Sequence, residues 1–408
     1  MMAAEFSTRV ERLLQLGQRE FGSFFNPGRE DLITVRAPGR VNLIGGHTDY
    51  NQGYVLPVAI DRELWAAIVP REDSLVKVYS SHYGERAAFD LNRIKYDEKN
   101  DWLNYLQGVA LFLQEEGSQL SGLNVVLQGN LPQGAGLSSS AALEMVLAFG
   151  WKLVDGLAQS RVELAHICRR AENQFVGVSC GIMDQFISAL GQRDRALFLD
   201  CRSQEYEYVP VSSSPEEEMK ILVADTGVSH KLSASGYNRR REECQQGVEF
   251  FNQRLDRELR SLRDLSWEDF MAFKAALPDQ LGDRCQHVLS ENERVKKCCK
   301  ALKEGNLPLA GELITRSHYS LRDLFQVSCY ELDLMVELAL QVEGVYGSRM
   351  TGAGFGGSTV NLVEGSSVDS FKERLTEGYL AQTGLKPEIY VCQIAEGCSI
   401  LAQEGDRG

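Results

Sequence analysis

The 408-residue sequence lacks the features of several protein classes. It contains no run of 18 consecutive apolar residues, so no membrane-spanning helix is expected. Its N-terminal stretch carries acidic residues and no continuous apolar segment, which argues against a secretory signal peptide. Positive charges are outnumbered 43 to 57, and a net charge of −14 disfavours nucleic-acid or anionic-membrane partners, both of which select basic surfaces.

Cysteine is missing from the first 167 residues, and the ten cysteines between Cys168 and Cys398 form no CxxC pair. The sequence therefore suggests neither a zinc ribbon nor a thioredoxin motif, and a disulfide framework is not expected. We interpret most of these thiols as small interior side chains in a reducing cytoplasm. Composition indicates no obligate protein partner.

Helical and strand periodicities alternate irregularly along the chain, which predicts an α+β fold. The proline-bracketed acidic segment 210–218 is the expected boundary between two domains, 1–210 and 211–408. Helices are expected at 6–21, 103–114, 141–154, 161–175 and 370–383, with a helix-rich region at 239–342. Strands are expected at 32–37, 54–69, 75–80, 123–127, 346–350, 358–364 and 388–394.

The most informative segment is LPQGAGLSSSAA at 131–142, between an expected strand and an apolar helix. A glycine-rich turn that leads into a helix exposes unpaired backbone N–H groups at the positive end of the helix dipole, which suits phosphate. No GKS or GKT follows, so it is not a Walker A loop. The alternative is a plain turn with serine N-caps, although three consecutive serines exceed what capping requires.

Two further glycine patterns are weaker. Gly352, Gly354 and Gly357 fit G-x-G-x-x-G, but a strand-like segment follows where a dinucleotide site needs a helix. The cluster is expected to join two strands, either as a plain turn or packed against the first glycine loop. GVSCG at 177–181 resembles a nucleophile elbow, but a helix precedes it where a strand is required.

Two acidic residues stand out. Asp184 lies near the start of an expected helix and off its apolar stripe, so it is either a solvated N-terminal acid or a carboxylate facing a cleft. Glu172 shares a helical face with Ala165 and Cys168 and is expected to point inward. A buried glutamate requires a cation, for which Mg²⁺ and a basic side chain are the alternatives.

A dense polar segment occupies residues 36–57 and includes Arg40, Asn42, His47, Asp49 and Asn51. Glycines and a proline interrupt regular structure there. Such a set on a turn suits hydrogen bonding to a hydroxyl-rich ligand, although a solvated loop is the alternative. One histidine with one aspartate is too little for a metal site.

Taken together, these segments resemble the galactokinases of the GHMP small-molecule kinase family. The matching stretches are PGRVNLIG followed by HTDY near the N-terminus, the 131–142 loop, CGIMDQ at 180–185 and GSRMTGAGFGG at 347–357. The resemblance implies an α+β, two-domain GHMP kinase fold, with an N-terminal domain like domain 2 of ribosomal protein S5 and a C-terminal α/β sandwich. ATP and sugar would meet in the cleft between the domains.

The resemblance also implies transfer of the ATP γ-phosphoryl group to the anomeric hydroxyl of α-D-galactose in the cytoplasm. Asp184 would be the catalytic carboxylate, with Arg40 beside it, and Ser140 and Glu172 would hold Mg²⁺. The implied sugar-binding residues are Arg40, His47, Asp49, Gly181, Asp184 and Tyr237. The implied ATP-binding residues are Trp102, Gly134, Ala135, Gly136, Leu137, Ser138, Ser139 and Ser140.

One departure concerns the sugar. The family signature has an acidic residue before the histidine, where it contacts a sugar hydroxyl, whereas this chain has Gly46. Losing a charge-assisted hydrogen bond costs about 1.5–3 kcal/mol, so this departure leaves the identity of the sugar substrate open. N-acetylgalactosamine is an alternative substrate, and a non-catalytic regulator that binds galactose and ATP is an alternative function.

Overall fold

A six-stranded sheet organises the N-terminal lobe. The computed structural model describes residues 2–132, 134–211, 219–229 and 233–401. Within the sheet, β4 runs parallel to β6 and the other neighbouring strands are antiparallel. The order across the sheet is β13 (Ser399–Ile400), β1 (Ile33–Asn42), β3 (Pro57–Arg71), β6 (Gly122–Gly129), β4 (Leu75–Ser80) and β5 (Glu85–Asp90).

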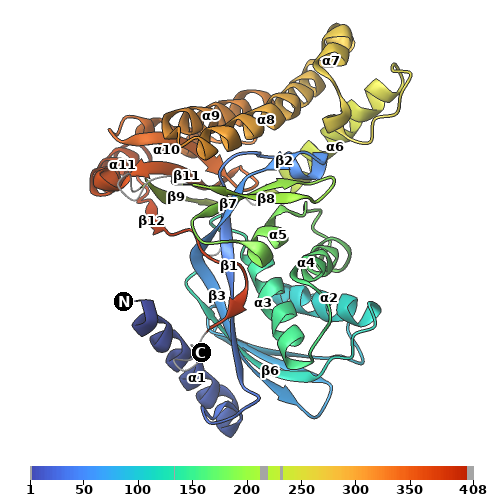
Figure 1. Cartoon of the computed structure of the whole chain (residues 1–408), viewed down its shortest axis with the longest axis vertical. Helices are drawn as coiled ribbons and strands as arrows, with labels where there is room; N and C mark the ends of the chain where they lie inside the picture. Colours follow the sequence, from blue (N-terminus) through green and yellow to red (C-terminus); the bar gives the residue numbers. More distant parts are fainter. Residues whose placement is uncertain (1, 133, 212–218, 230–232, 402–408) are drawn as a thin grey trace.

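The period-two pattern of β3 explains why both faces of this sheet are covered. Ala66 and Ile68 pack in the main core, whereas the alternate residues Trp65 and Val69 pack with Leu13 on the other face. Helix α1 (Met2–Phe21) covers this second face (Figure 1). The main-core face carries α2 (Asp101–Glu115), α3 (Ser139–Val154), α4 (Arg161–Arg170) and α5 (Met183–Leu190).

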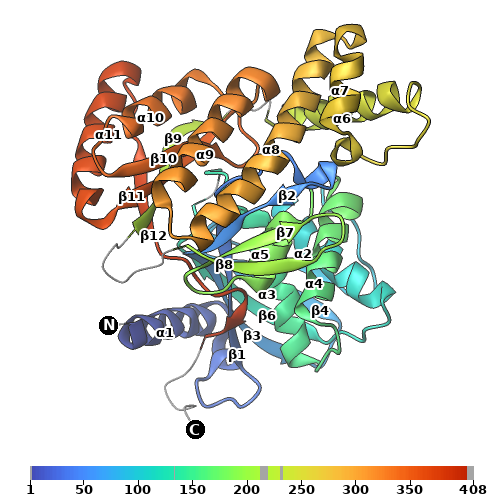
Figure 2. The same cartoon turned by 45° about the horizontal axis from the view of Figure 1, so that its top comes forward.

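The C-terminal lobe is built on a four-stranded sheet in the order β10 (Val345–Thr351), β11 (Gly356–Glu364), β9 (Met219–Ser229) and β12 (Glu388–Cys392). One face packs on α10 (Tyr330–Leu340) and α11 (Val368–Thr383). The other face packs on α8 (Asp279–Lys303) and α9 (Leu307–Ser320). Helices α6 (Ser233–Asn252) and α7 (Trp267–Phe273) lie at the far end of α8 from α11 (Figure 2).

The two lobes share one apolar core. Val58 of β3, Val223 of β9 and Val295 of α8 belong to the same buried cluster. A small sheet of β2 (Tyr54–Val55), β7 (Arg195–Asp200) and β8 (Tyr206–Pro210) lies beside α8. Residues 212–218 of the expected boundary lie outside the described residues, and the division after residue 210 stays a prediction.

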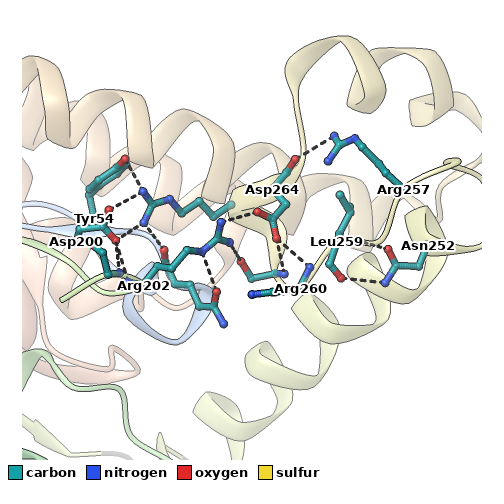
Figure 3. A network of polar contacts seen from close by, with 12 residues as sticks. Tyr54, Asp200, Arg202, Asn252, Arg257, Leu259, Arg260 and Asp264 are labelled. Atoms are coloured by element: carbon teal, nitrogen blue, oxygen red, sulfur yellow. Dashed lines mark hydrogen bonds and ion pairs between the residues drawn. The ribbon is translucent and has the colours of Figure 1, made fainter. Parts of the chain in front are cut away.

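A polar network fastens the segment after α6 to the small sheet (Figure 3). Arg263 donates to the Tyr54 hydroxyl and to Asp200 Oδ2, each at 2.6 Å. Arg202, in the turn between β7 and β8, donates to Asp264 Oδ1 at 2.6 Å. These contacts join the C-terminal lobe to β2, which lies within the polar segment 36–57, and to β7 with the turn that follows it, so the lobes are held together by charge as well as by apolar packing.

Most predicted elements are confirmed, with two kinds of difference. The helix expected at 161–175 leaves α-helical geometry after Arg170 and continues as a π-helical turn over Ala171–Val176. The sequence analysis gives no bounds for a strand at β5, β7, β8, β9 or β13. Four of these are at most six residues long, and their pairing depends on partners far away in the sequence.

Close contact between α9 and β10 generates a stability prediction. A Cβ atom on Gly311 would lie 2.0 Å from the Tyr346 carbonyl oxygen, and neither backbone can move aside cheaply. We expect Gly311→Ala to lower the free energy of unfolding by about 3 kcal/mol, as for other overpacked sites.

Gly282 in α8 is the matched control, because a Cβ there meets nothing within 4 Å. Gly282→Ala is expected to raise stability by about 0.5 kcal/mol through helix propensity. Urea unfolding of both variants checks this prediction, and equal midpoints would contradict the close approach.

Candidate active site

The first glycine loop leaves the N-terminus of α3 open. Gly134, Gly136 and Ser138 have positive φ angles of 75°, 73° and 61°. The Ser138 side chain, at the N-cap position, makes no capping hydrogen bond to the helix, and its hydroxyl instead donates to Asp184 Oδ2. Serine capping is therefore wrong for Ser138, and the helix N-terminus keeps unpaired N–H groups that suit an anion.

The second glycine cluster supports this loop. It joins β10 to β11, as expected, and the Ser358 hydroxyl donates to the Ala135 carbonyl at 2.7 Å. A Cβ on Gly352 would lie 3.1 Å from the Gly136 carbonyl oxygen. Glycine is needed there for the close approach of two backbones, and packing against the first loop is confirmed over the plain turn.

An ion pair connects the loop to α5. Arg40 at the end of β1 donates from Nε and Nη2 to the two carboxylate oxygens of Asp184, both at 2.7 Å. Its third nitrogen, Nη1, donates to the Gly136 carbonyl at 2.6 Å. The Arg40 side chain is 7% exposed and that of Asp184 is 26% exposed, so the acid is the partner that reaches solvent. This fork-on-fork geometry fixes the carboxylate in one orientation.

His47 is held by both ring nitrogens. Nε2 lies 3.1 Å from the Ala353 carbonyl, which can only accept, so Nε2 carries the proton and Nδ1 accepts from the Tyr50 hydroxyl at 2.8 Å. Burial lowers the pKa of His47 to about 3, and the ring is neutral at physiological pH. The Tyr237 ring lies 5.5 Å from it.

Asp49 faces the same space as Asp184. A Cβ on Gly181 would overlap the Asp49 carboxylate, so glycine at 181 lets the acid lie against the start of α5. Burial, and after it the charge of Asp184, raises the pKa of Asp49 to about 6. This carboxylate therefore changes charge just below neutral pH.

Side chains of helix α8, in the C-terminal lobe, make hydrogen bonds to the backbone of the polar segment 36–57. Glu291 Oε1 accepts the N–H groups of Gly45 at 2.9 Å and Gly46 at 3.2 Å. His287 Nε2 donates to the Gly46 carbonyl at 3.0 Å, and Asn292 accepts the N–H of Tyr54 at 2.9 Å. The sequence analysis missed these residues, and the available signal was a buried face of α8 that is polar where a core helix is normally apolar.

Two buried glutamates lie behind Asp184. Glu172 is 6% exposed, and Glu144 is fully buried with Oε1 lacking a hydrogen-bond partner among the described residues. The Gln185 amide donates to Glu172 at 2.7 Å and to Glu144 at 3.2 Å. Burial is the main cause that raises the pKa of both carboxyls. The described partners of Glu172 are Gln185, Cys180 and Ser140, none of which is a cation.

Two cavities border these residues. The first has a volume of about 300 Å³ and is lined by all six residues expected to bind the sugar: Arg40, His47, Asp49, Gly181, Asp184 and Tyr237. The second, of about 220 Å³, is lined by Trp102, Ser139 and Ser140 of the expected nucleotide site, together with Tyr83, whose ring stacks on Trp102 at 5.2 Å. We call them the sugar pocket and the nucleotide pocket.

The rest of the described chain offers no competing centre. Within 2–132, 134–211, 219–229 and 233–401, no three or more histidine, cysteine, aspartate or glutamate side chains group as a metal site. In the same residues, no helix has the length and apolar character needed to cross a membrane. All ten cysteines are free, and those other than Cys180 and Cys329 are buried.

Comparison with known proteins agrees with this geometry. The galactokinase galactose-binding signature matches residues 19–70, the GHMP kinases N terminal domain matches 104–192, and the GHMP kinases C terminal domain matches 299–380. The galactokinase of Chloroflexus aurantiacus is 44% identical over 90% of this chain and 93% of its own length. That of Clostridium tetani is 41% identical over 93% and 96%.

Solved structures show the same relationship. Lactococcus lactis galactokinase complexed with galactose superposes with a TM-score of 0.90 at 35% identity, covering 96% of this chain and 99% of that one. Methanococcus jannaschii mevalonate kinase, at 18% identity and a TM-score of 0.64, shares the fold over 90% of this chain and 100% of its own. The chain therefore belongs to the galactokinase family within the GHMP kinases, and members of the galactokinase family are ATP-dependent sugar phosphotransferases.

Proposed function

We propose that this enzyme transfers the γ-phosphoryl group of ATP to the C1 hydroxyl of α-D-galactose, giving galactose 1-phosphate and ADP. The observation that carries the proposal is the Arg40–Asp184 pair. Asp184 lines the sugar pocket. Arg40 bonds the Gly136 carbonyl of the first glycine loop (residues 131–142), which we call the phosphate loop, and Ser138 of that loop bonds Asp184. One rigid unit thus touches both the acceptor and the donor side.

The transfer requires alignment and charge neutralisation more than covalent chemistry. The C1 oxygen attacks the γ-phosphorus, the bond to the β-phosphate oxygen breaks, and ADP leaves. Asp184 has one acceptor position left on Oδ1, because three donors already occupy the others. In our proposal that position accepts the C1 hydroxyl, orients it and receives its proton, while Arg40 stabilises charge on the moving phosphoryl group.

The proposed sugar contacts follow from the remaining pocket residues. Asp49 accepts hydrogen bonds from sugar hydroxyls. His47 and Tyr237 line the pocket with side chains that have both apolar ring faces and polar atoms. Gly181 leaves room for Asp49. Trp102 borders the nucleotide pocket, and Gly134 to Ser140 carry the phosphates on backbone N–H groups. We also propose that the enzyme acts in the cytoplasm, consistent with its free cysteines.

The residues present fit Mg²⁺. Glu172 is a buried carboxylate with no cation among its described partners, and the Ser140 hydroxyl bonds it. Carboxylate and hydroxyl oxygens are ligands that Mg²⁺ accepts, and it usually takes few protein ligands beside substrate phosphates. Ser140 and Glu172 would hold the ion, which when bound neutralises charge on the ATP phosphates.

The proposal is tested by ADP release over a panel of sugars that includes galactose, N-acetylgalactosamine, glucose and mannose. Galactose is expected to give the highest kcat/KM of these four sugars. Binding of galactose and ATP without any ADP formation would contradict the proposal in favour of a regulator.

Asp184→Asn is expected to lower kcat at least about a hundredfold, the scale of acid–base contributions, while ATP affinity changes little. Initial rates and nucleotide titration measure both quantities. Asp194→Asn, at an exposed turn, is the control with the same change of charge. Near-full turnover of Asp184→Asn would remove this carboxylate from the mechanism.

Galactose affinity is expected to depend on pH through Asp49. Hydroxyl groups donate more strongly to a carboxylate than to its acid. Because the pKa of Asp49 is raised to about 6, lowering the pH through 6 protonates it and weakens galactose binding, by roughly tenfold at one unit below. His47 and His287, with pKa values lowered to about 3 and 4, stay neutral in this range.

Calorimetric titration between pH 5 and 8 checks this dependence. Asp49→Asn should bind galactose more weakly than the wild type at pH 8 and with a flat profile. A profile in this variant that still bends near pH 6 would assign the titration to another group.

Glu172→Gln is expected to raise the Mg²⁺ concentration needed for half-maximal activity at least about tenfold, the usual effect of altering a metal site. Mn²⁺ binding in the presence of ATP, followed by electron paramagnetic resonance, measures affinity without turnover. Glu163→Gln, which keeps the capping box of α4, is the matched control. Unchanged metal affinity in Glu172→Gln would place the ion elsewhere.

A further inference from the structure

One wall of the sugar pocket has no side chain. Gly46 lines the pocket, and behind it lies Arg349 of β10, which is fully buried. Arg349 Nη2 stands 2.8 Å from the point that a Cβ on Gly46 would occupy. A guanidinium group therefore fills the space that the missing side chain leaves.

No described hydrogen bond pairs the positive charge of Arg349 with a carboxylate. Its Nε donates to the Met350 carbonyl at 2.7 Å, and Nη1 is buried with no hydrogen-bond partner among the described residues. Although burial lowers the pKa of Arg349 to about 10, the group remains charged at neutral pH. A buried cation with an unpaired donor is unfavourable unless an anion or acceptor approaches it.

Glu291, the acidic residue of this cluster, already accepts hydrogen bonds from other groups. Glu291 Oε2 accepts from Arg294 Nε at 2.7 Å, and Oε1 accepts the backbone N–H groups of Gly45 and Gly46. Burial also lowers the pKa of His287, to about 4, so the ring adds no charge. Two guanidinium groups thus lie beside one carboxylate, and one positive charge behind Gly46 has no counter-ion in this cluster.

Gly46 and Asp184 both line the pocket, and each is held by a different lobe. Asp184 is held by the phosphate loop and β1 of the N-terminal lobe. Gly46 is backed by His287, Leu321 and Arg349 of the C-terminal lobe. In a pyranose, C4 and C6 lie on the far side of the ring from C1, so a sugar with C1 at Asp184 directs these groups away from that carboxylate. Of these two carbons, only C6 is a primary alcohol whose oxidised form is a carboxylate.

We propose that the sugar pocket also accepts a hexuronic acid, with the C6 carboxylate at Gly46 and Arg349 as the specificity-determining residue. The proposal rests on the proposed function for the position of C1. The reaction is the same: the C1 oxygen bonds the γ-phosphorus, ADP leaves, the hydroxyl proton passes to Asp184, and the C6 carboxylate is unchanged. The carboxylate supplies the missing negative charge across Gly46, without contact with the guanidinium group, which is fully buried and does not line the pocket.

The experiment compares kcat/KM for D-galacturonate and D-galactose, with binding of each sugar measured by calorimetry. In the wild type, galacturonate is expected to reach at least about a tenth of the galactose value, a difference within 1.4 kcal/mol. Arg349→Gln is expected to lower the ratio of galacturonate to galactose at least about tenfold, the scale of one electrostatic interaction between partly buried charges.

Gly46→Glu tests the same idea with Arg349 retained, and it decides the matter if Arg349→Gln does not fold. Gly46 has no positive φ, and the three atoms nearest to a Cβ there are at the ends of the Arg349 and Leu321 side chains. The new carboxylate is expected to neutralise the guanidinium, to repel galacturonate and to tighten galactose binding, which lowers the ratio at least about tenfold.

Arg316→Gln is the matched control. It removes a positive charge from α9 of the same lobe, but the Arg316 side chain is 65% exposed and pairs with Glu312. The ratio is expected to change less than about threefold, because solvent screens this charge.

Failure of the wild type to bind galacturonate while it phosphorylates galactose would overturn this proposal and leave the proposed function standing. An unchanged ratio in Gly46→Glu would also overturn it. No ADP from either sugar would instead contradict the proposed function.

Discussion

The ion pair between Arg40 and Asp184 is the contact on which the active site depends. It unites the end of β1, the phosphate loop and the start of α5, three segments that are far apart in the sequence. Its two parallel hydrogen bonds fix both position and orientation of the carboxylate. Because the same arginine bonds the Gly136 carbonyl, a shift of the loop would disturb the acid, and this contact couples the sites that we propose for nucleotide and sugar.

The C-terminal lobe acts on the reaction mainly as a support. Ser358 and Gly352 hold the phosphate loop from one side, and Glu291 and His287 hold the turn at Gly45 and Gly46 from another. Both sets act on backbone atoms. The geometry of the pocket therefore depends on buried polar contacts from a lobe that contributes few of the groups expected to touch the substrates.

The sequence predicted the helices with clear apolar faces and the glycine loops, because those signals are local. It placed Arg40, Asp184 and His47 in one site through resemblance to a known family, not through spacing. Short strands such as Arg195–Asp200 were missed because they are stabilised by partners distant in sequence. Glu291 and Arg349 were missed for the same reason: a buried charge is recognisable only when its neighbours are known, and those neighbours come from other elements.

The last strand has a consequence for how the molecule is made. β13 pairs with β1, and Leu401 bonds the backbone of Thr34 and packs with Leu13 under α1. The first sheet is thus completed by the final part of the described chain, after the whole C-terminal lobe has been synthesised. In a nascent chain emerging from the ribosome, this edge of the sheet stays unpaired, and exposed to aggregation and to chaperones, until residues 399–401 have been made.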